Sequence, residues 1–252
     1  MIPKKIHYCW FGGGEKSKLI KKCIRSWKKF CPDYEITEWN EKNFDIDSSP
    51  QYVKDAYKEK RWAFVADYAR LWIIYNYGGI YLDTDVELIK NIDDVLEQDA
   101  FFAFASSDKI NTGLGFGAVR SNIIVKKMME DYDDLKFYLD DGSINTITCV
   151  VINSHCIREF GFRLDNTLQT VDGCTVYPTE YFCPKGYRSY KPEITPNTYS
   201  VHWYNLSWKT AKNRMSHIKE IKADYYKHLP NKILMSVLGE KNYNKLKGKI
   251  RF

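Results

Sequence analysis

The chain has 252 residues, of which 44% are apolar and 28% charged, as is ordinary for a soluble protein of one α/β domain with a small appendage. Its net charge of +6 is uneven, because residues 209–252 carry +9 (12 Lys/Arg, 3 Asp/Glu) and the rest −3 (26 Lys/Arg, 29 Asp/Glu). The basic character therefore belongs to the tail, which argues against a nucleic-acid-binding body and for a tail that meets an anionic surface.

A strand, a glycine turn, a helix and a second strand are predicted over the first 40 residues. The apolar run Ile6–Phe11 indicates a strand that Gly12–Gly14 ends, and Ser17 is a typical helix N-cap. A second strand, Tyr34–Trp39, follows the Pro32–Asp33 turn. The intervening helix has its apolar residues on one face: Ile20, Cys23, Trp27 and Phe30. This order of elements is the unit that builds a parallel sheet.

The strongest helical pattern covers residues 51–77 and stops at Gly78–Gly79, because glycine accepts the left-handed conformation that follows many helices. A strand, Ile80–Leu82, comes directly after it. Further elements are expected in chain order: a strand at 115–119, a helix at 121–134 and a strand at 199–203.

The tail is expected to be helical in two pieces. Its first apolar stripe ends before Pro230, which interrupts the helical pattern, and a second stripe follows. We therefore expect one domain over residues 1–210 and a basic helical extension over 211–252. The apolar positions are Ile218, Ile221, Tyr225 and Leu229, then Ile233, Leu234, Val237 and Leu238.

Two carboxylates, Asp83 and Asp85, follow the apolar strand Ile80–Leu82. Residues two apart in a strand point to the same side, and ligands of open α/β sheets bind beyond the carboxyl ends of strands. Two carboxylates aimed together repel unless a cation lies between them, and Mg²⁺ or Mn²⁺ would also take oxygens from a substrate diphosphate. A D-x-D in a surface loop is the simpler alternative, but the preceding buried strand favours a metal site.

The stretches Ala63–Arg70 and Gly78–Asp85 closely resemble glycosyltransferase family 32. This DXD-containing family holds mannosyltransferases of yeast, bacterial capsule glycosyltransferases and, more distantly, large clostridial toxins that transfer glucose. The segment Ile2–Trp10 is similar to the family's start, and Trp27–Ile36 looks most like its bacterial polysaccharide-synthesis members. The resemblance implies a GT-A fold, which is a Rossmann-like, mostly parallel sheet with the nucleotide-sugar at its carboxyl edge. It also implies a divalent metal, usually Mn²⁺.

The same resemblance implies a retaining glycosyltransferase that moves a hexose from a nucleotide-sugar to a saccharide acceptor. A UDP-hexose is the first expectation for the donor and GDP-mannose the second. A lipid-linked capsule or O-antigen oligosaccharide is the expected acceptor, with a protein target left open. The basic tail would suit an anionic membrane surface that carries such acceptors, while a helix pair packed on the domain remains an equal alternative.

Site residues carry over from the family motif position by position. Asp85 would bind the metal directly, and Asp83 would contact it through water or contact the ribose. Asp67 and Arg70 lie one helical turn apart, so both can face the site. The resemblance gives Asp67 to sugar or ribose hydroxyls and Arg70 to the same region or the phosphates, whereas an ordinary salt-bridged helix face is the alternative. Tyr81 would lie near the ribose or the donor sugar.

The remaining nucleotide contacts are expected from three other segments. His7, Cys9 and Trp10 lie where the family's first strand meets the base, and Trp10 would either stack on the base or pack in the core. Asn111 belongs to a glycine-containing loop expected beside the donor sugar.

The segment His202–Lys209 is similar to the family's closing His…Ser-Trp motif. His202 would bind the metal or a phosphate, completing a ligand set with Asp83 and Asp85. Ser207, Trp208 and Lys209 would contact the phosphates, where negative charge builds up as the glycosidic bond breaks.

Three other functional classes stay open from the sequence. A haloacid-dehalogenase-type phosphatase also has an apolar strand ending in D-x-D, but it wants Thr or Val where this chain has Glu87. A non-catalytic carbohydrate-binding or effector protein would need no intact acidic and basic set. A two-carboxylate glycoside hydrolase would need neither metal nor nucleotide.

Seven cysteines without a C-x-x-C pair favour neither a disulfide framework nor a zinc site. No apolar run approaches the ~20 residues that span a bilayer, and the N-terminus lacks a stretch typical of a signal peptide. We therefore expect a cytoplasmic protein, with peripheral contact at the inner face of the cell membrane as an open alternative.

Overall fold

The computed structural model describes residues 1–205 and 211–239. The chain divides into two compact units. Unit 1 comprises Met1–Gly186 and Pro192–Trp208, and unit 2 comprises Tyr187–Lys191 and Lys209–Phe252.

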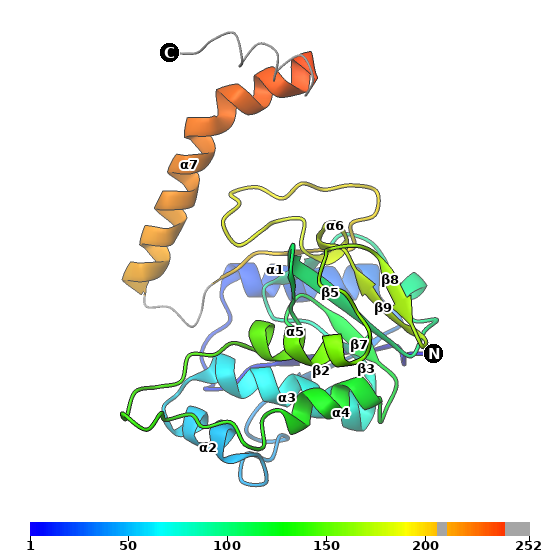
Figure 1. The fold of residues 1–252 in the computed structure, drawn as a ribbon, viewed down its shortest axis with the longest axis vertical. Helices are drawn as coiled ribbons and strands as arrows, with labels where there is room; N and C mark the ends of the chain where they lie inside the picture. Colours follow the sequence, from blue (N-terminus) through cyan, green and yellow to red (C-terminus); the bar gives the residue numbers. More distant parts are fainter. Residues whose placement is uncertain (206–210, 240–252) are drawn as a thin grey trace. The chain divides into compact units, whose positions relative to one another are not determined.

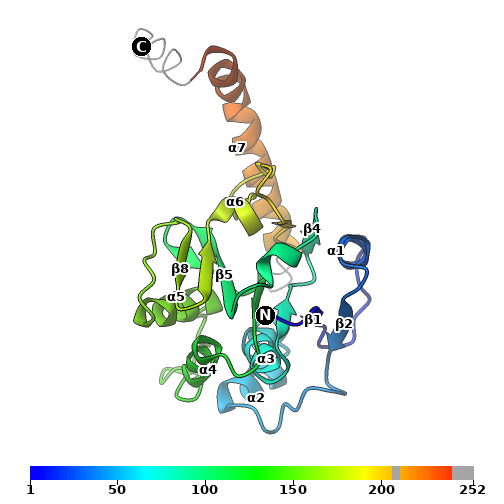
Figure 2. The ribbon, with the colours of Figure 1, turned by 90° about the vertical axis from the view of Figure 1, so that its right-hand side faces the viewer.

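Unit 1 is built on an eight-stranded sheet in the order β2-β1-β3-β7-β5-β9-β8, with β6 paired to β5 (Figures 1 and 2). Strands β1, β2, β3, β5 and β9 share one direction, and β6, β7 and β8 run against them. The predicted α/β class with a mostly parallel central sheet is therefore confirmed. The strands are β1 Lys5–Cys9, β2 Glu35–Trp39, β3 Gly79–Tyr81, β5 Ala100–Ser106, β6 Lys109–Ile110, β7 Phe116–Ala118, β8 Gln169–Val171 and β9 Cys174–Tyr177.

Helices cover both faces of the sheet and enclose two apolar clusters. One cluster lies under α2 to α5 and the other under α1 and α6. A second, two-stranded sheet pairs β4 Val86–Leu88 with β10 Ser200–His202. The helices are α1 Lys18–Phe30, α2 Gln51–Lys58, α3 Trp62–Tyr77, α4 Ile123–Glu130, α5 Cys149–Glu159 and α6 Thr179–Phe182, with a 3-10 turn at Asp93–Val95.

The N-terminal order of strand, helix and strand is confirmed, although β1 ends at Cys9 and not at Phe11. Ser17 caps α1, because its Oγ accepts a hydrogen bond from the Ile20 N–H at 3.3 Å. The predicted apolar face of α1 is buried at Ile20, Cys23 and Trp27. This face packs α1 onto the sheet beside β4, where the Trp27 indole donates to the Val86 carbonyl at 2.8 Å.

The single helix predicted over 51–77 is wrong, because the structure has two helices there. α2 ends at Lys58 and α3 begins at Trp62, and Lys60 adopts a left-handed φ of 57° between them. The charged run 58–61 leaves the helical periodicity of its flanks intact, so the pattern hides the break.

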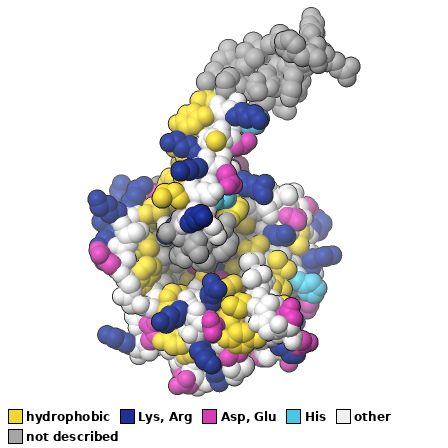
Figure 3. Space-filling view, turned by 90° about the vertical axis from the view of Figure 1, so that its left-hand side faces the viewer, with side chains coloured by type: hydrophobic (Ala, Val, Ile, Leu, Met, Phe, Trp, Pro, Cys, Tyr) yellow, Lys and Arg dark blue, Asp and Glu magenta, His cyan; other side chains and the backbone are white. Residues whose placement is uncertain are grey.

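In its described residues, unit 2 contains one long helix, α7 Ala211–Leu238. The predicted break at Pro230 is wrong, since helical backbone continues through it; the fixed φ of proline is compatible with a helix although one hydrogen bond is lost. Its described surface carries both apolar and basic side chains (Figure 3). Among the described residues, no helix is both long enough and apolar enough to cross a bilayer.

Candidate active site

The site is built around the chain that leaves β3. Two glycines allow α3 to pass at once into this strand: Gly78 has φ 64° and Gly79 has φ 104°, and a Cβ on Gly79 would lie 2.8 Å from the Lys5 carbonyl oxygen. Beyond the strand, the Asp83 N–H donates to the Gly113 carbonyl, and a turn closes with the Val86 N–H on the Asp83 carbonyl. The acidic residues therefore occupy a turn between β3 and β4.

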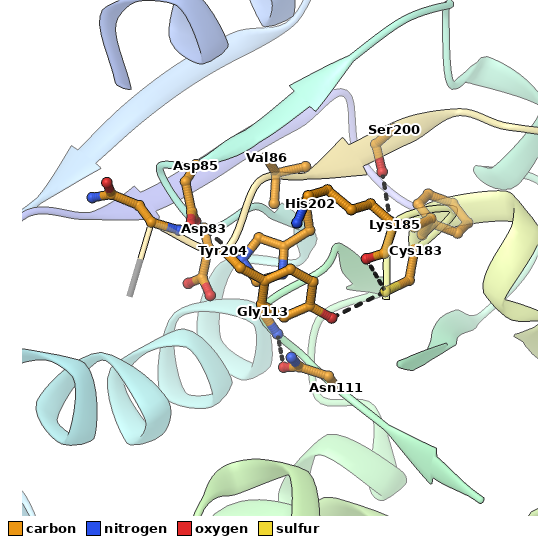
Figure 4. A network of polar contacts seen from close by, with 12 residues as sticks. Asp83, Asp85, Val86, Asn111, Gly113, Cys183, Lys185, Ser200, His202 and Tyr204 are labelled. Carbon is orange, nitrogen blue, oxygen red and sulfur yellow. Dashed lines mark hydrogen bonds and ion pairs between the residues drawn. The ribbon is translucent and has the colours of Figure 1, made fainter. Parts of the chain in front are cut away.

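This turn corrects the expected geometry of the acidic pair. Asp83 and Asp85 do not continue β3 with alternating side chains, because residues 84 and 85 are in the turn. The turn nevertheless keeps both carboxylates on the same side, at the carboxyl edge of the sheet (Figure 4). Their proximity thus comes from the turn between two short strands.

His202 reaches Asp85 through the small sheet. Antiparallel pairing of β10 with β4 sets His202 opposite Val86, and His202 Nε2 lies 3.1 Å from Asp85 Oδ1. The other carboxylate oxygen of Asp85 accepts the Asn205 N–H at 2.6 Å. Tyr204 has a left-handed φ of 51°, a strained conformation for this residue type, and so turns the chain that brings Asn205 to the carboxylate.

Asp83, Asp85 and His202 form a candidate metal site. Each offers one ligand atom, and these atoms lie within 4.8 Å of one another. Oxygen ligands of a hard divalent ion at about 2.1 Å can be about 4.2 Å apart, so the spread is close to what one ion needs. His202 Nδ1 is buried and has no hydrogen-bond partner among the described residues. Two carboxylates and one imidazole, which has this unpaired nitrogen, fit a divalent ion such as Mn²⁺ or Mg²⁺.

Arg70 forms ion pairs with Asp67 and with one member of the acidic pair, Asp83. Its Nη2 lies 3.1 Å from Asp67 Oδ1 and 3.0 Å from Asp83 Oδ1, and its side chain is 4% exposed. Its guanidinium carbon lies 5.0 Å from the centre of the Tyr81 ring, and the Tyr81 hydroxyl donates to Asp83 Oδ1 at 3.2 Å. The structure thus joins four predicted site residues in one buried network, in which Arg70 already meets two carboxylates.

The loop that contains Asn111 and Gly113 packs against this network. The Asn111 side chain accepts the Gly113 N–H at 2.7 Å, which shapes a tight turn against Asp83. Arg70 Nη1 also lies 3.6 Å from the Cys149 sulfur at the first turn of α5. Asn111 therefore holds the loop beside the acidic pair.

The pKa values of the two acidic residues, Asp83 and Asp85, are shifted in opposite directions. Burial raises the pKa of Asp83 more than Arg70 lowers it. Burial also disfavours ionised Asp85, but His202 and the Asn205 N–H outweigh it and lower the Asp85 pKa. Burial opposes the charge on His202 too, yet Asp85 raises the His202 pKa above its usual value. Asp85 is thus held as a carboxylate, as a metal ligand requires.

The other residues predicted to contact the nucleotide are spread apart. His7 turns away from the acidic pair, because Trp39 donates to its Nδ1 at 3.1 Å and its Nε2 lies 3.0 Å from the Gly78 carbonyl. Cys9 is buried against Tyr81, and burial raises the pKa of its thiol to about 12. The Trp10 indole donates to the Gly14 carbonyl at 2.8 Å.

Ser207, Trp208 and Lys209 lie outside the described residues. Two neighbours of His202 were not predicted, namely Lys185 and Tyr204, which Figure 4 shows beside it. Tyr204 stands within the predicted motif, so its position could have suggested it. Lys185 has no such signal, because it is a single lysine in a region without a clear pattern.

Comparisons with known proteins agree with this geometry. Residues 17–102 match the family described as glycosyltransferase sugar-binding region containing DXD motif. The uncharacterized glycosyltransferase L373 of Acanthamoeba polyphaga mimivirus is 32% identical over 221 residues, which are 82% of this chain and 84% of that protein. Inositol phosphoceramide mannosyltransferase 3 of Schizosaccharomyces pombe is 34% identical over 126 residues, 46% of this chain, and the match spans only a third (33%) of that relative's length.

The solved structure of PaToxG Glycosyltransferase superposes with a TM-score of 0.50 at 17% identity, over 63% of this chain and 68% of that one. At this identity the likeness concerns the fold alone, and it agrees with the GT-A-like arrangement expected from the sequence. The mimivirus relative and the family match carry the assignment further, since residues 83–85 are a D-x-D inside the matched region. The chain therefore belongs to the glycosyltransferases whose sugar-binding region contains a DXD motif.

Proposed function

We propose that this glycosyltransferase uses a divalent metal, Mn²⁺ or Mg²⁺, to transfer a hexose from a nucleotide-sugar with retention of configuration. The observation that carries the proposal is the convergence of Asp83, Asp85 and His202 at the carboxyl edge of β3, with His202 Nδ1 buried and unpaired among the described residues. When bound there, the metal would neutralise the diphosphate of the donor.

The chain's own residues would fix the ligands that the metal needs. Asp85 is held by the Asn205 N–H and His202, and Asp83 by Arg70 and Tyr81. These contacts restrict both carboxylates to one orientation before the donor arrives, which lowers the ordering cost of binding.

Retention would follow from attack on the same face that the diphosphate leaves. Asp67 is poorly suited to serve as a covalent nucleophile, since its largely covered carboxylate is ion-paired with Arg70 at 3.1 Å. In this proposal the leaving diphosphate accepts the proton of the acceptor hydroxyl.

A UDP-hexose remains the first proposal for the donor and GDP-mannose the second. The name of the Schizosaccharomyces pombe relative, a mannosyltransferase, supports including the second. Thermal-shift measurements with UDP-hexoses and GDP-mannose, with and without Mn²⁺, test both, because a ligand that binds only the folded state raises the melting temperature. We expect a shift of several degrees that needs both metal and one nucleotide-sugar. No shift with any pair would contradict the proposal.

Family membership sets aside the phosphatase and hydrolase alternatives, and the non-catalytic alternative can be tested by donor turnover. Slow hydrolysis of the bound nucleotide-sugar, abolished by a chelator, would show a working site. Binding without any turnover, with saccharide acceptors present, would support a carbohydrate-binding or effector role.

The acceptor is proposed to be a saccharide, lipid-linked as in capsule or O-antigen synthesis. The relative named for inositol phosphoceramide makes a lipid-linked acceptor reasonable. The described part of α7 also exposes Met215, Ile218 and Tyr226 among basic side chains (Figure 3), which suits a peripheral site on an anionic membrane from the cytoplasmic side. The exposed lysines of this part are Lys212, Lys219, Lys222 and Lys227.

Vesicle sedimentation tests the membrane proposal with the full chain. Each lysine near an anionic surface contributes about 1 kcal/mol, so we expect binding to vesicles that contain phosphatidylserine and none to pure phosphatidylcholine. The double change Met215→Ser and Ile218→Ser should weaken this binding at least tenfold. Equal binding of the variant and the original chain would contradict a role for α7.

A further inference from the structure

Lys185 is a buried lysine beside the candidate metal site. It follows α6 in the segment Cys183-Pro184-Lys185, and the residue is only 5% exposed. The Cys183 sulfur contacts the Lys185 carbonyl at 3.5 Å, and the Cys183 N–H donates to the Thr179 carbonyl at 2.7 Å. The backbone that carries Lys185 is therefore tied to α6.

The ammonium of Lys185 extends toward His202 (Figure 4). It lies 5.4 Å from the centre of the Tyr204 ring, and it makes no ion pair or hydrogen bond with any described side chain or carbonyl. Burial lowers its pKa, while Cys183 and Asp85 act in the opposite direction. The stem of Lys185 is packed, but its Nζ is not among the fully enclosed polar atoms that lack a partner, so the ammonium is reached by solvent and is open to an anion that enters the site.

Arg70, the other basic side chain near the acidic pair, differs from Lys185 because it is ion-paired. Its charge is met by Asp67 and Asp83 at 3.1 and 3.0 Å, which leaves it little capacity for a further anion. Lys185 lies on the His202 side of the acidic pair, where no such carboxylate pairs with it among residues 1–205 and 211–239. Of these two basic residues, Arg70 is therefore paired with carboxylates, and Lys185 is paired with none among the described residues.

The Tyr204 ring lies against both the Lys185 ammonium and the candidate metal ligand His202. Its ring centre lies 4.2 Å from that of His202, and its hydroxyl lies 3.1 Å from the Cys183 sulfur. Its left-handed backbone is the same turn that places Asn205 on Asp85. Tyr204 therefore contacts both His202 and the Lys185 ammonium through its ring, while its strained backbone brings Asn205 to Asp85.

We propose that Lys185 binds the diphosphate of the donor and of the leaving nucleoside diphosphate. This inference rests on the proposed function, since it assumes that a nucleotide-sugar occupies the site. In the transfer, the bond between the anomeric carbon and the β-phosphate oxygen breaks, and its electron pair stays on that oxygen. The acceptor oxygen forms the new bond, and its proton passes to the leaving diphosphate. Lys185 keeps its own proton and stabilises the charge that grows on the phosphate.

The test measures how tightly Lys185→Met and Lys185→Arg bind a nucleoside diphosphate and the corresponding nucleoside, which lacks the phosphates. Calorimetry with saturating Mn²⁺ would measure UDP against uridine, or GDP against guanosine, using whichever diphosphate the original chain binds. A hydrogen bond to a charged group contributes about 1.5–3 kcal/mol, so Lys185→Met should weaken diphosphate binding about 10- to 100-fold. Binding of the nucleoside should change less than about twofold, and Lys185→Arg should restore most of the diphosphate affinity.

Lys90→Met is the matched control, because Lys90 also lies over a tyrosine ring, Tyr199 at 3.9 Å, but is tied to the Pro196 carbonyl away from the acidic pair. It should bind the diphosphate like the original chain. The ligand-free melting temperature of Lys185→Met should stay close to that of the original chain, since the change removes no ion pair or hydrogen bond that the ammonium makes with a described residue.

Unchanged diphosphate affinity in a folded Lys185→Met variant would overturn the inference. So would an equal loss for nucleoside and diphosphate, or a large fall in the ligand-free melting temperature, since each indicates a structural role. If the original chain bound no nucleoside diphosphate with Mn²⁺, the proposed function itself would fail before Lys185 was tested.

Discussion

Gly113 is the position where one added methyl group should disable the site without replacing any candidate metal ligand. A Cβ at Gly113 would lie 2.1 Å from Asp83 Oδ2, 3.0 Å from its carboxyl carbon and 3.1 Å from Arg70 Nη1. Gly113 does not have the left-handed backbone that favours glycine, so Gly113→Ala adds steric conflict without backbone strain. The carboxylate would have to move, and Asp83 is held on its other oxygen by Arg70 and Tyr81.

The size of the displacement follows from contact distances. Ordinary contact begins near 3.4 Å, so the oxygen at 2.1 Å must shift by about 1.3 Å. Misplacing a catalytic group by about 1 Å can lower turnover about 100-fold. We therefore expect Gly113→Ala to lower Mn²⁺-dependent donor hydrolysis about 100-fold and nucleotide affinity at least tenfold, about 1.4 kcal/mol.

The assay pairs calorimetric binding of the nucleotide with donor hydrolysis, both with Mn²⁺. Gly14→Ala is the control, because a Cβ there meets nothing within 4 Å and the backbone is also not left-handed. Circular dichroism checks that both variants are folded, since overpacking itself costs about 1–3 kcal/mol. A folded Gly113→Ala variant with the original affinity and turnover would refute the reasoning, since Asp83 would then not need its observed position.

Two further predictions concern stability. Arg70→Met should lower the free energy of unfolding by about 3–5 kcal/mol, because Asp67 and Asp83 lose their buried cation. Adding Asp67→Asn should recover part of the loss. Urea unfolding measures both variants, and an unchanged free energy of unfolding in Arg70→Met would contradict this prediction. Burial lowers the pKa of His7 to about 4 from 6.5, so the unfolded chain binds the proton first and stability falls as pH drops from 6.5 toward 4. At pH 5 the loss is about 2 kcal/mol. Urea unfolding of His7→Gln at pH 7 and 5 should lack this part of the pH dependence, and an unchanged dependence would be the contrary result.

The local features of the fold were predictable because their signals are local. Ser17 is a typical N-cap and predicts the start of α1, and Gly78 and Gly79 predict the end of α3 and the start of β3. The acidic pair was found for the same reason, although its geometry comes from a turn and not from an extended strand. The break at Lys60 was missed, since a charged surface turn between two helices keeps their periodicity.

Long-range features could not be predicted in this way. The sequence motif indicates His202, but its contact with Asp85, 117 positions away in the sequence, depends on the pairing of β10 with β4. β4 has only three residues, too few for a periodic signal. Lys185 was missed because neither burial nor an unpaired charge is visible in a single residue letter.

The most direct test of the central claim is anomalous diffraction at the manganese edge from crystals grown with Mn²⁺ and the bound nucleoside diphosphate. The structure predicts one strong peak between Asp83, Asp85 and His202, with the diphosphate oxygens on the same ion. Manganese and diphosphate located together elsewhere, with Asp85 still bound only to His202 and the Asn205 N–H, would contradict it.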